Sequence, residues 1–300
     1  MADTRAEVRD FLASRRAKIT PEQAGLTVYG GNRRVPGLRR EEAALLAGVS
    51  VDYYTRLERG NLAGVSEGVL EALARALQLD DAERDHLFDL ARAANASPRA
   101  RQRAPRQAVR PSVQFMLEAI TGAPAFVRNA RMDILAANPL GFALYSQMYD
   151  DVARHTLDVP VRPANHSRFI FLDTRAREFY PDWALAANNN VALLRTESGR
   201  NPYDKGLADL VGELSTRSEE FAALWARHNV RRHYSGNKQF RHPVVGDLEL
   251  LFEALVPSED PGLTLTVYPA VPGSPSEESL RLLASWAATE RIGERARAER

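Results

Sequence analysis

Four side chains between residues 51 and 56 have the types and the spacing needed to contact the edges of DNA bases. Val51, Asp52, Thr55 and Arg56 stand at i, i+1, i+4 and i+5, so on a helix they share one face. The arginine could donate two hydrogen bonds to O6 and N7 of guanine, the valine could contact a thymine methyl, and the aspartate could accept from cytosine N4. For Asp52 an alternative stays open, because a carboxylate in the first turn also stabilises the helix dipole.

Two short helices are needed to present these side chains. The first is predicted from Arg40 to Ala47, and Gly48 ends it because a residue without a Cβ enters the left-handed conformation cheaply. Ser50 is a good N-cap for the second helix, in which Tyr54 and Leu57 face inward. This layout predicts a DNA-binding helix-turn-helix, and the alternative is an ordinary helical hairpin in a core.

Other polar residues around this motif are candidates for contacts with the DNA backbone. Arg40 begins the first helix, where free amides and a guanidinium can hold a phosphate together. Tyr53 is a further phosphate candidate, and Arg39 and Arg59 are weaker ones. The loop arginines Arg33 and Arg34 are either an arm for a minor groove or merely solvated charges. The expected DNA-binding residues are Arg33, Arg34, Arg39, Arg40, Ser50, Val51, Asp52, Tyr53, Thr55, Arg56 and Arg59.

The first domain is expected over residues 1–95. Helical periodicity over 6–17, over 66–77 and after Asp80 or Asp81 adds three helices to the central pair, and the residues from 20 to 38 read as a loop. Residues 96–111 are expected to be a linker, since the segment from Arg92 to Pro111 holds six arginines, three prolines and no acidic residue. The linker is either a solvated hinge or an arginine tether that touches phosphate.

Length and charge agree with two domains, one of which has a polyanionic partner. A chain of 300 residues with 44% hydrophobic residues is expected to form about two packed domains. Residues 1–111 carry 19 Lys and Arg against 15 Asp and Glu, a net +4, and the remainder carries 21 against 24, a net −3. The basic half holds the helix-turn-helix, which suits DNA. The absence of cysteine excludes disulfides, thiolate metal ligands and a cysteine nucleophile.

Patterns for export or membrane insertion are not found. The first residues, MADTRAEVRDFLASRR, are charged and lack the apolar centre of a signal peptide. No run of about 18 apolar residues appears, which a membrane span would need. The sequence therefore predicts a cytoplasmic location.

From residue 112 the pattern changes to that of an α+β domain, expected over 112–275. Helices are predicted at 113–120, 138–145, 168–180, 181–194, 205–215 and 219–228. Strands are predicted at 124–127, 132–136, 230–234, 246–256 and 263–269. Strands, a block of helices and then antiparallel strands indicate a sheet with helices covering one face. A last helix is expected from Ser276, within residues 276–300, with a charged end that frays.

With these segments placed, the chain resembles the MmyB-like branch of the XRE family of bacterial transcription regulators. The N-terminal resemblance rests on VPGLRREEAALLAGVSVDYYTRLERG and VLEALARALQLDDAERDHLFDLA. The C-terminal one rests on DILAANPLG, RFIFLDTRAREFYPDW, FAALWARHNVRR, KQFRHPVVGDLEL and PGSPSEESLRLLASW. It implies a λ-repressor-like domain of five helices, followed by a PAS-like domain with an antiparallel sheet that binds a small apolar ligand such as a fatty acid.

A site for such a ligand needs a mostly apolar cleft with a few polar groups that fix its orientation. An arginine would suit a carboxylate head group through bidentate geometry. For Arg168 the alternative is an ion pair with Asp173 or Glu178. The expected ligand-binding residues are Asn165, Arg168, Phe169, Trp183, His228, Arg231 and Arg241.

Three functions are compatible with these observations. The first is a ligand-responsive regulator that binds two half-sites of double-stranded DNA as a homodimer, since one chain offers one recognition helix. The second is a DNA-binding regulator whose C-terminal domain serves only dimerisation or protein contact. The third, an enzyme, is disfavoured because the six histidines form no HExxH or other tight ligand spacing and no GxSxG or phosphate-binding glycine loop is present. No catalytic residue, metal or cofactor is therefore expected.

Overall fold

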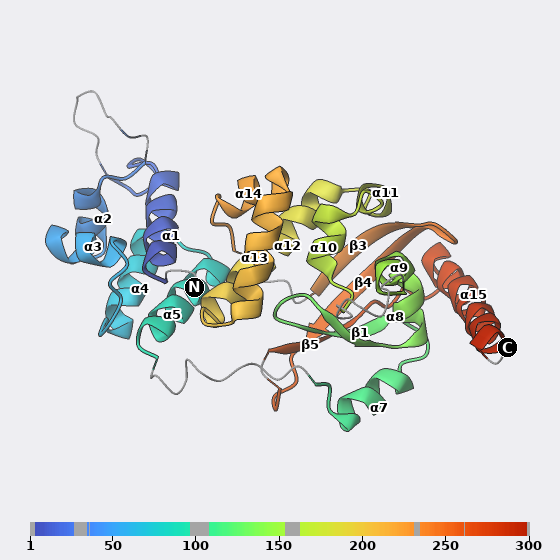
Figure 1. The fold of residues 1–300 in the computed structure, drawn as a ribbon. Helices are drawn as coiled ribbons and strands as arrows, with labels where there is room; N and C mark the ends of the chain where they lie inside the picture. The colour runs from blue at the N-terminus through green and yellow to red at the C-terminus, as the bar shows by residue number, and fades with distance from the viewer. Residues whose placement is uncertain are drawn as a thin grey trace. The chain divides into compact units, whose positions relative to one another are not determined.

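The computed structural model describes residues 4–26, 35, 37–96, 108–153, 163–230, 235–260 and 262–298 (Figure 1). The chain divides into two compact units. Unit 1 comprises Met1–Ala104, Val191–Gly212 and Ala222–Arg232. Unit 2 comprises Pro105–Asn190, Glu213–Phe221 and His233–Arg300.

The first part of unit 1 contains the five helices that the sequence predicts. They are α1 (Thr4–Lys18), α2 (Arg40–Leu46), α3 (Val51–Glu58), α4 (Glu67–Ala76) and α5 (Asp81–Ala94). The turn between α2 and α3 forms as expected, because Gly48 has a φ of 65° and the Ser50 hydroxyl accepts a hydrogen bond from the Tyr53 amide at 3.1 Å. Asp80 is the N-cap of α5 and forms a capping box with Glu83.

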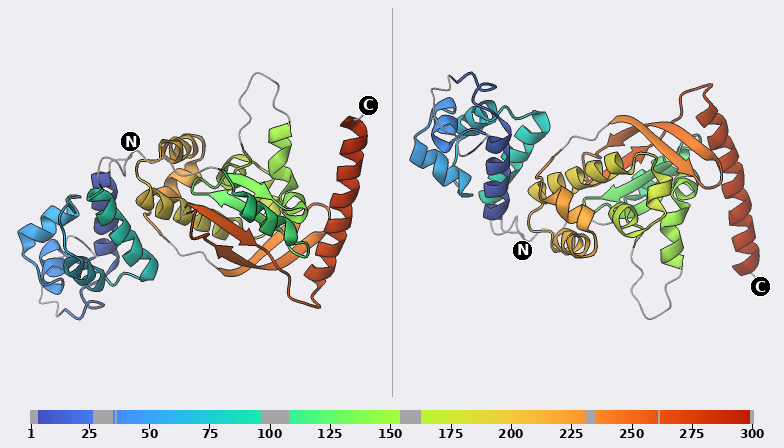
Figure 2. Two further views of the ribbon diagram at one scale, coloured as in Figure 1. Left: turned by 90° about the horizontal axis from the view of Figure 1, so that it is seen from below. Right: turned by 90° about the horizontal axis from the view of Figure 1, so that it is seen from above.

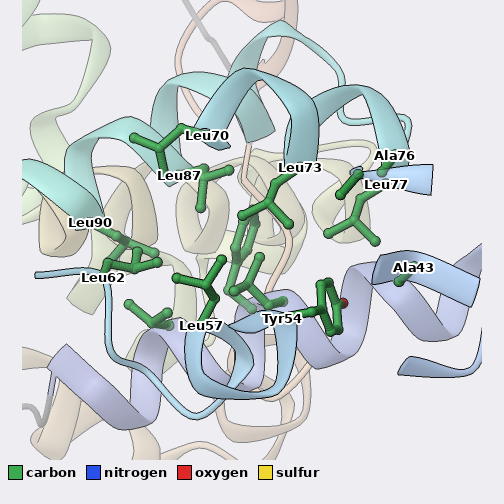
Figure 3. Close-up of a cluster of buried hydrophobic side chains, with 14 of the residues drawn as sticks. Ala43, Tyr54, Leu57, Leu62, Leu70, Leu73, Ala76, Leu77, Leu87 and Leu90 are labelled. Atoms are coloured by element: carbon green, nitrogen blue, oxygen red, sulfur yellow. The ribbon is translucent and has the colours of Figure 1, made fainter. Parts of the chain in front are cut away.

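Apolar side chains from all five helices form one core in unit 1. Tyr54 and Leu57 of α3 are fully buried there, as their i, i+3 spacing predicts. Figure 3 shows both residues facing the leucines of α4 and α5. Val230, from the second half of the sequence, belongs to the same cluster.

Three helices contribute residues to both units. They are α12 (Trp183–Arg200), α13 (Lys205–Arg217) and α14 (Glu219–Trp225). The sequence assigns all three to the domain over 112–275, whereas the segments 191–212 and 222–232 pack within unit 1.

Unit 2 is built around a five-stranded antiparallel sheet, so the expected α+β PAS-like domain is confirmed. The strand order is β2-β1-β5-β4-β3. The strands are β1 (Ala125–Asn129), β2 (Ile134–Ala137), β3 (Ser235–His242), β4 (Gly246–Leu255) and β5 (Leu263–Val267). Every strand pairing is antiparallel, and β1 joins β2 on one side and β5 on the other.

Helices lie against both faces of this sheet, so the expectation that they cover one face is wrong. Val113 and Leu117 of α7 (Pro111–Ala119) pack on the β1 residues Ala125 and Val127. Phe126 points to the opposite face, because side chains alternate along a strand, and there it contacts Tyr145 and other rings. The helices of this second layer are α8 (Pro139–Leu144), α9 (Ser146–Ala153), α10 (His166–Leu172) and α11 (Ala176–Phe179). The last helix, α15 (Pro275–Ala298), contacts α8 and β4 and is a single rod in both views of Figure 2.

One sequence-based element prediction is wrong, and another falls mostly outside the described residues. The single helix expected over 168–180 is two, because α10 ends at Leu172 and the Asp173 carboxylate accepts from the Arg175 amide at 2.9 Å, which forms a turn. The strand expected at 230–234, after the helical block, is tested only at its first residue. Val230 is not in a strand, residues 231–234 lie outside the described residues, and the strand is β3 at Ser235–His242. In the part of the chain that the structure describes, no helix has the length and apolar character needed to cross a membrane.

Candidate DNA interface and ligand site

The outer face of α3 carries the side chains that the sequence predicts for base contacts. Val51 is 46% exposed, Asp52 and Arg56 are exposed, and Thr55 is half-buried. Since Tyr54 holds the opposite face in the core, these four side chains point to solvent from a fixed helix. They are therefore placed where a DNA groove could receive them.

Arg56 is oriented by its neighbour Tyr53. The centre of the Arg56 guanidinium lies 4.9 Å from the centroid of the Tyr53 ring, which is the geometry of a cation–π interaction. Such stacking limits the conformations that the arginine adopts before it meets a base. Ser50 is occupied as the cap of α3, so its role in the interface is to fix the start of this helix.

Arg40 is held at the start of α2 by a buried carboxylate. Its Nη2 atom lies 3.3 Å from Oε1 of Glu58, and the same oxygen receives Nη2 of Arg16 at 2.8 Å. Burial alone would raise the pKa of the Glu58 carboxyl, but hydrogen bonds from Arg16 and Arg40 and their charges lower it. The Arg40 side chain is still 55% exposed, so its guanidinium can also meet a phosphate.

Four arginines remain among the expected DNA-binding residues. Arg39 forms an exposed ion pair with Glu41, with Nη1 and Oε1 3.5 Å apart. Arg59 is exposed and caps the end of α3. Arg33 and Arg34 lie outside the described residues.

Two of the expected ligand-binding residues are engaged in contacts within unit 2. Asn165 is the N-cap of α10: its Oδ1 accepts from the Arg168 amide at 3.0 Å, and its Nδ2 donates to the Arg131 carbonyl at 2.7 Å and to Oδ1 of Asp133 at 2.8 Å. Arg168 forms the ion pair considered as the alternative, but with another carboxylate, because Nε and Nη2 both contact Oε2 of Glu213, at 3.0 and 2.9 Å.

The other expected ligand residues lie apart from one another. Phe169 is buried against the rings of Phe179 and Tyr180. Trp183 donates its Nε1–H to the Ile170 carbonyl at 3.0 Å. Arg241 pairs with Asp247 at 3.3 Å and lines an open cleft of about 550 Å³ beside β3 and β4. His228 belongs to unit 1, and Arg231 lies outside the described residues.

The sequence reasoning missed a polar group inside the aromatic layer of unit 2. Nζ of Lys238, on β3, donates to the Tyr268 hydroxyl at 3.1 Å, and this hydroxyl lies 3.2 Å from that of Tyr145. Lys238 also sits over the rings of Phe252 and Tyr268, at 5.4 and 5.5 Å from their centroids. Among the described residues, Lys238 has no acidic partner in an ion pair. Its signal in the sequence was alternation with Phe240 and His242, two buried residues of the same strand.

Lys238 is the cation of the group that it forms with Tyr145, Tyr268 and His166. Burial raises the pKa of the Tyr145 hydroxyl well above its usual value, so the hydroxyl stays protonated. His166 packs on the Tyr145 ring with centroids 4.7 Å apart, and burial, together with the charges of Lys238 and Arg128, lowers its pKa well below the usual 6.5. The imidazole is therefore neutral, and within the described residues its buried Nδ1 has no hydrogen-bond partner. A single anionic group on an apolar molecule would complement these side chains.

The described residues contain no cluster of three or more His, Asp or Glu side chains that could hold a metal ion.

Two family models match the chain. One, described as a helix-turn-helix domain, matches residues 8–87, and the other, described as an MmyB-like transcription regulator ligand binding domain, matches residues 109–283. A comparison with curated proteins found no match. The first match covers the helices around α3, and the second covers the sheet and the aromatic group beneath it.

Proposed function

This chain belongs to the family of MmyB-like transcription regulators, and from that membership we propose that it binds specific DNA sequences and senses a small amphipathic ligand with an anionic head group. The two matched domains make it a DNA-binding transcription regulator with a ligand-binding C-terminal domain. A fatty acid is the simplest ligand of the proposed kind. The role assigns the chain no catalytic step and no cofactor, and access to DNA would place it in the cytoplasm.

The exposed face of α3 supports the DNA-binding part of the proposal. Val51, Asp52, Thr55 and Arg56 would contact bases, whereas Arg40 and the weaker candidates Arg39 and Arg59 would contact phosphates. Because one chain presents one such helix, we propose that it binds as a homodimer to two half-sites about one DNA turn apart.

The observation that carries the ligand part is the Lys238 ammonium among tyrosine hydroxyls and aromatic rings. Lys238 and the hydroxyls of Tyr145 and Tyr268 would hold the head group, because an ammonium and two donors match a carboxylate. The apolar chain would lie against the surrounding rings. Asn165 and Arg168 would shape the start of α10 rather than touch the ligand, since their polar atoms are already engaged.

Native mass spectrometry of the purified chain, before and after solvent extraction, would test whether it carries a lipid. A titration with dodecanoate would then test the assigned head-group site. We expect Lys238→Met to weaken dodecanoate binding by about ten- to a hundredfold, the effect of losing one charge-assisted hydrogen bond. Lys205→Met, which removes an exposed lysine from the start of α13, is the matched control. Equal affinity in the two variants would remove Lys238 from the site.

A second function, in which the C-terminal domain serves only dimerisation or protein contact, is favoured by one observation. Phe115 and Met116 of α7 are 67% and 56% exposed, which is unusual for neighbouring large apolar residues. If no lipid is retained, dodecanoate does not bind and a Phe115→Ser, Met116→Ser variant changes the oligomeric state, this second function replaces the first.

A further inference from the structure

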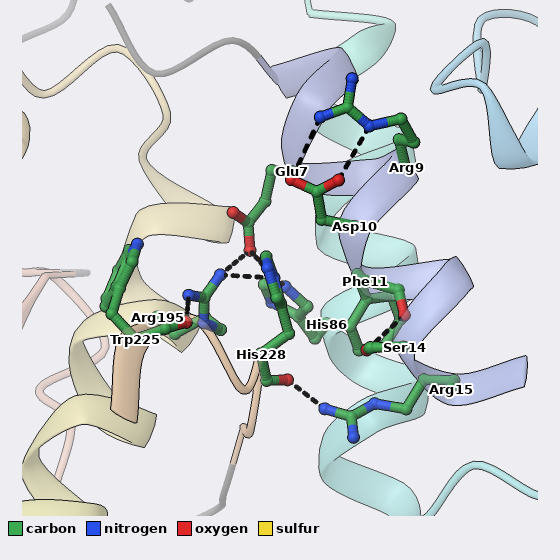
Figure 4. Close-up of polar contacts among 10 residues, drawn as sticks. All are labelled: Glu7, Arg9, Asp10, Phe11, Ser14, Arg15, His86, Arg195, Trp225 and His228. Atoms are coloured by element: carbon green, nitrogen blue, oxygen red, sulfur yellow. Dashed lines mark hydrogen bonds and ion pairs between the residues drawn. The ribbon is translucent and has the colours of Figure 1, made fainter. Parts of the chain in front are cut away.

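A buried arginine from the second half of the sequence lies among charged residues of the DNA-binding unit (Figure 4). Arg195, on α12, has a fully buried side chain. Its Nη1 atom contacts a carboxylate oxygen of Glu7 on α1 and lies 2.9 Å from Nδ1 of His228, and its Nη2 donates to the Trp225 carbonyl. All four residues belong to unit 1.

Glu7 is the common partner in this cluster. The oxygen that Arg195 contacts also lies 3.6 Å from Nδ1 of His228 and 3.8 Å from Nε2 of His86 on α5. Burial would raise the pKa of the Glu7 carboxyl, but the neighbouring imidazoles of His228 and His86 and the charge of Arg195 hold it well below its usual value. The carboxylate is therefore ionised, and it is the only acidic group among the described residues that pairs with Arg195.

Close packing accompanies the ion pair. A Cβ added to Gly199 of α12 would lie 2.5 Å from Cε1 of His86, so the backbone of α12 touches the imidazole ring. One residue further on, Nε of Arg200 lies 3.2 Å from Oδ2 of Asp89 on α5. The second half of α12 is thus attached to α1 and α5 by charge and by direct contact.

The first half of α12 belongs to unit 2 and is anchored beside the proposed ligand group. Trp183 donates to the carbonyl of Ile170 on α10, and α10 begins at His166, whose ring packs on Tyr145. From residue 183 to residue 195, α12 is an unbroken helix of about 18 Å. A displacement of α10 would therefore reach Arg195 through a rigid element rather than through a loop.

We propose that the Glu7–Arg195 ion pair couples the ligand-binding domain to the DNA-binding helices, with α12 as the element that transmits the change. This coupling rests on the proposed function. Ligand at Lys238 shifts α10 and with it α12, and the ion pair carries the shift to α1, which packs on α3. The linker between the domains then only tethers them, and Glu7 and Arg195 are positioning residues that touch neither DNA nor ligand.

Hydrogen–deuterium exchange of the full-length chain tests the attachment without any ligand. In Glu7→Gln we expect the amides of 191–200 and 222–228 to exchange faster than in the wild type by about tenfold or more, because Arg195 loses its charged partner. Glu67→Gln removes an exposed carboxylate from the first turn of α4 and should leave these amides unchanged. Unchanged exchange of 191–200 in Glu7→Gln would overturn the proposal.

A double variant, Glu7→Gln with Arg195→Met, keeps the test open if the single variant does not fold, because it leaves no unpaired buried charge. Added dodecanoate should change exchange in 166–190 and in 4–18 of the wild type, but only in 166–190 of the double variant. By reciprocity, a duplex selected by the chain from a random pool should alter 166–190 in the wild type alone.

The coupling would be refuted if dodecanoate changed exchange in 4–18, or the duplex changed exchange in 166–190, as much in the double variant as in the wild type. It would also be refuted if neither change occurred in the wild type. Failure of the proposed function has a different signature: dodecanoate alters no segment, or the pool yields no preferred duplex. If only dodecanoate binding fails, the experiment with the duplex still tests the coupling. If only duplex selection fails, the experiment with dodecanoate tests it. If both fail, the coupling fails with the function, although faster exchange in Glu7→Gln would still show the attachment.

Discussion

The contact between Gly199 and His86 gives a prediction whose sign differs from the usual effect of glycine in a helix. Replacing glycine by alanine inside a helix normally stabilises a protein by about 1 kcal/mol, because glycine loses more conformational freedom on folding. At Gly199 the new methyl would lie 2.5 Å from Cε1 and 2.6 Å from Nδ1 of the His86 ring. The ring is fully buried, with Phe11 at a centroid distance of 5.0 Å, so it cannot turn away into solvent.

The magnitude follows from a matched comparison with Gly212. This glycine lies in α13, is exposed, and a Cβ added to it meets no atom within 4 Å. Gly212→Ala should therefore show the gain from helix propensity alone. Gly199→Ala receives the same gain but overpacks the His86 ring, which costs about 1–3 kcal/mol. The free energies of unfolding of the two variants should differ by that amount, with Gly199→Ala the less stable.

Urea denaturation of both variants and the wild type, followed by circular dichroism, would measure this difference. The urea midpoint of Gly199→Ala should be lower than that of Gly212→Ala. The slopes of the free energy of unfolding against urea concentration should be equal. Hydrogen–deuterium exchange should locate the loss at α5 and the second half of α12. Equal stabilities, or a gain at Gly199, would refute the inference that the α12 backbone touches the imidazole.

Two further predictions concern the DNA-contacting face and the charged cluster. In titrations of base-substituted duplexes, Arg56→Ala should lose about 1–3 kcal/mol of discrimination at one base pair. Arg40→Ala should weaken binding to all duplex sequences alike and should reduce the dependence of DNA affinity on salt concentration. Unaltered discrimination in Arg56→Ala would exclude that arginine from base contact. The stabilisation by Glu7 should be complete above its ordinary pKa of 4.5 and should fall at lower pH, because its folded pKa is depressed and unfolding then takes up a proton. Wild-type urea midpoints should therefore drop more steeply below pH 4.5 than those of Glu7→Gln, and parallel curves would contradict this.

Local patterns account for the parts of the structure that could be predicted from the sequence. The turn at Gly48, the cap at Ser50 and the exposed face of α3 depend on residues within a few positions of one another. The same holds for β4 and β5, whose apolar residues recur along a single strand. Where the stabilising contacts join residues that are close together in the sequence, helical or strand periodicity is enough to place the element.

The features that escaped prediction depend on partners far along the chain. Glu7 and Arg195 are separated by 188 positions, and no spacing rule pairs an arginine with a carboxylate at that distance. Lys238 was missed for another reason: β3 is mostly polar, and the alternation of Lys238 with Phe240 and His242 is too short to mark a strand. The partner of Lys238, the Tyr268 hydroxyl, lies 30 positions further along the chain. The break after Leu172 was hidden because the helical period continues through Asp173.

The polar composition of β3 also limits how two copies of this chain could associate. As the last strand in the sheet order, β3 has no strand on one side among the described residues. A bare edge of this kind invites another chain to extend the sheet, which leads to fibrils as readily as to dimers. Here the exposed side chains, those of Ser235, Asn237, Gln239 and Arg241, are polar, and polar or charged side chains on an edge strand disfavour its pairing with another chain. Sheet extension is thereby discouraged, and the proposed homodimer is expected to form through other surfaces.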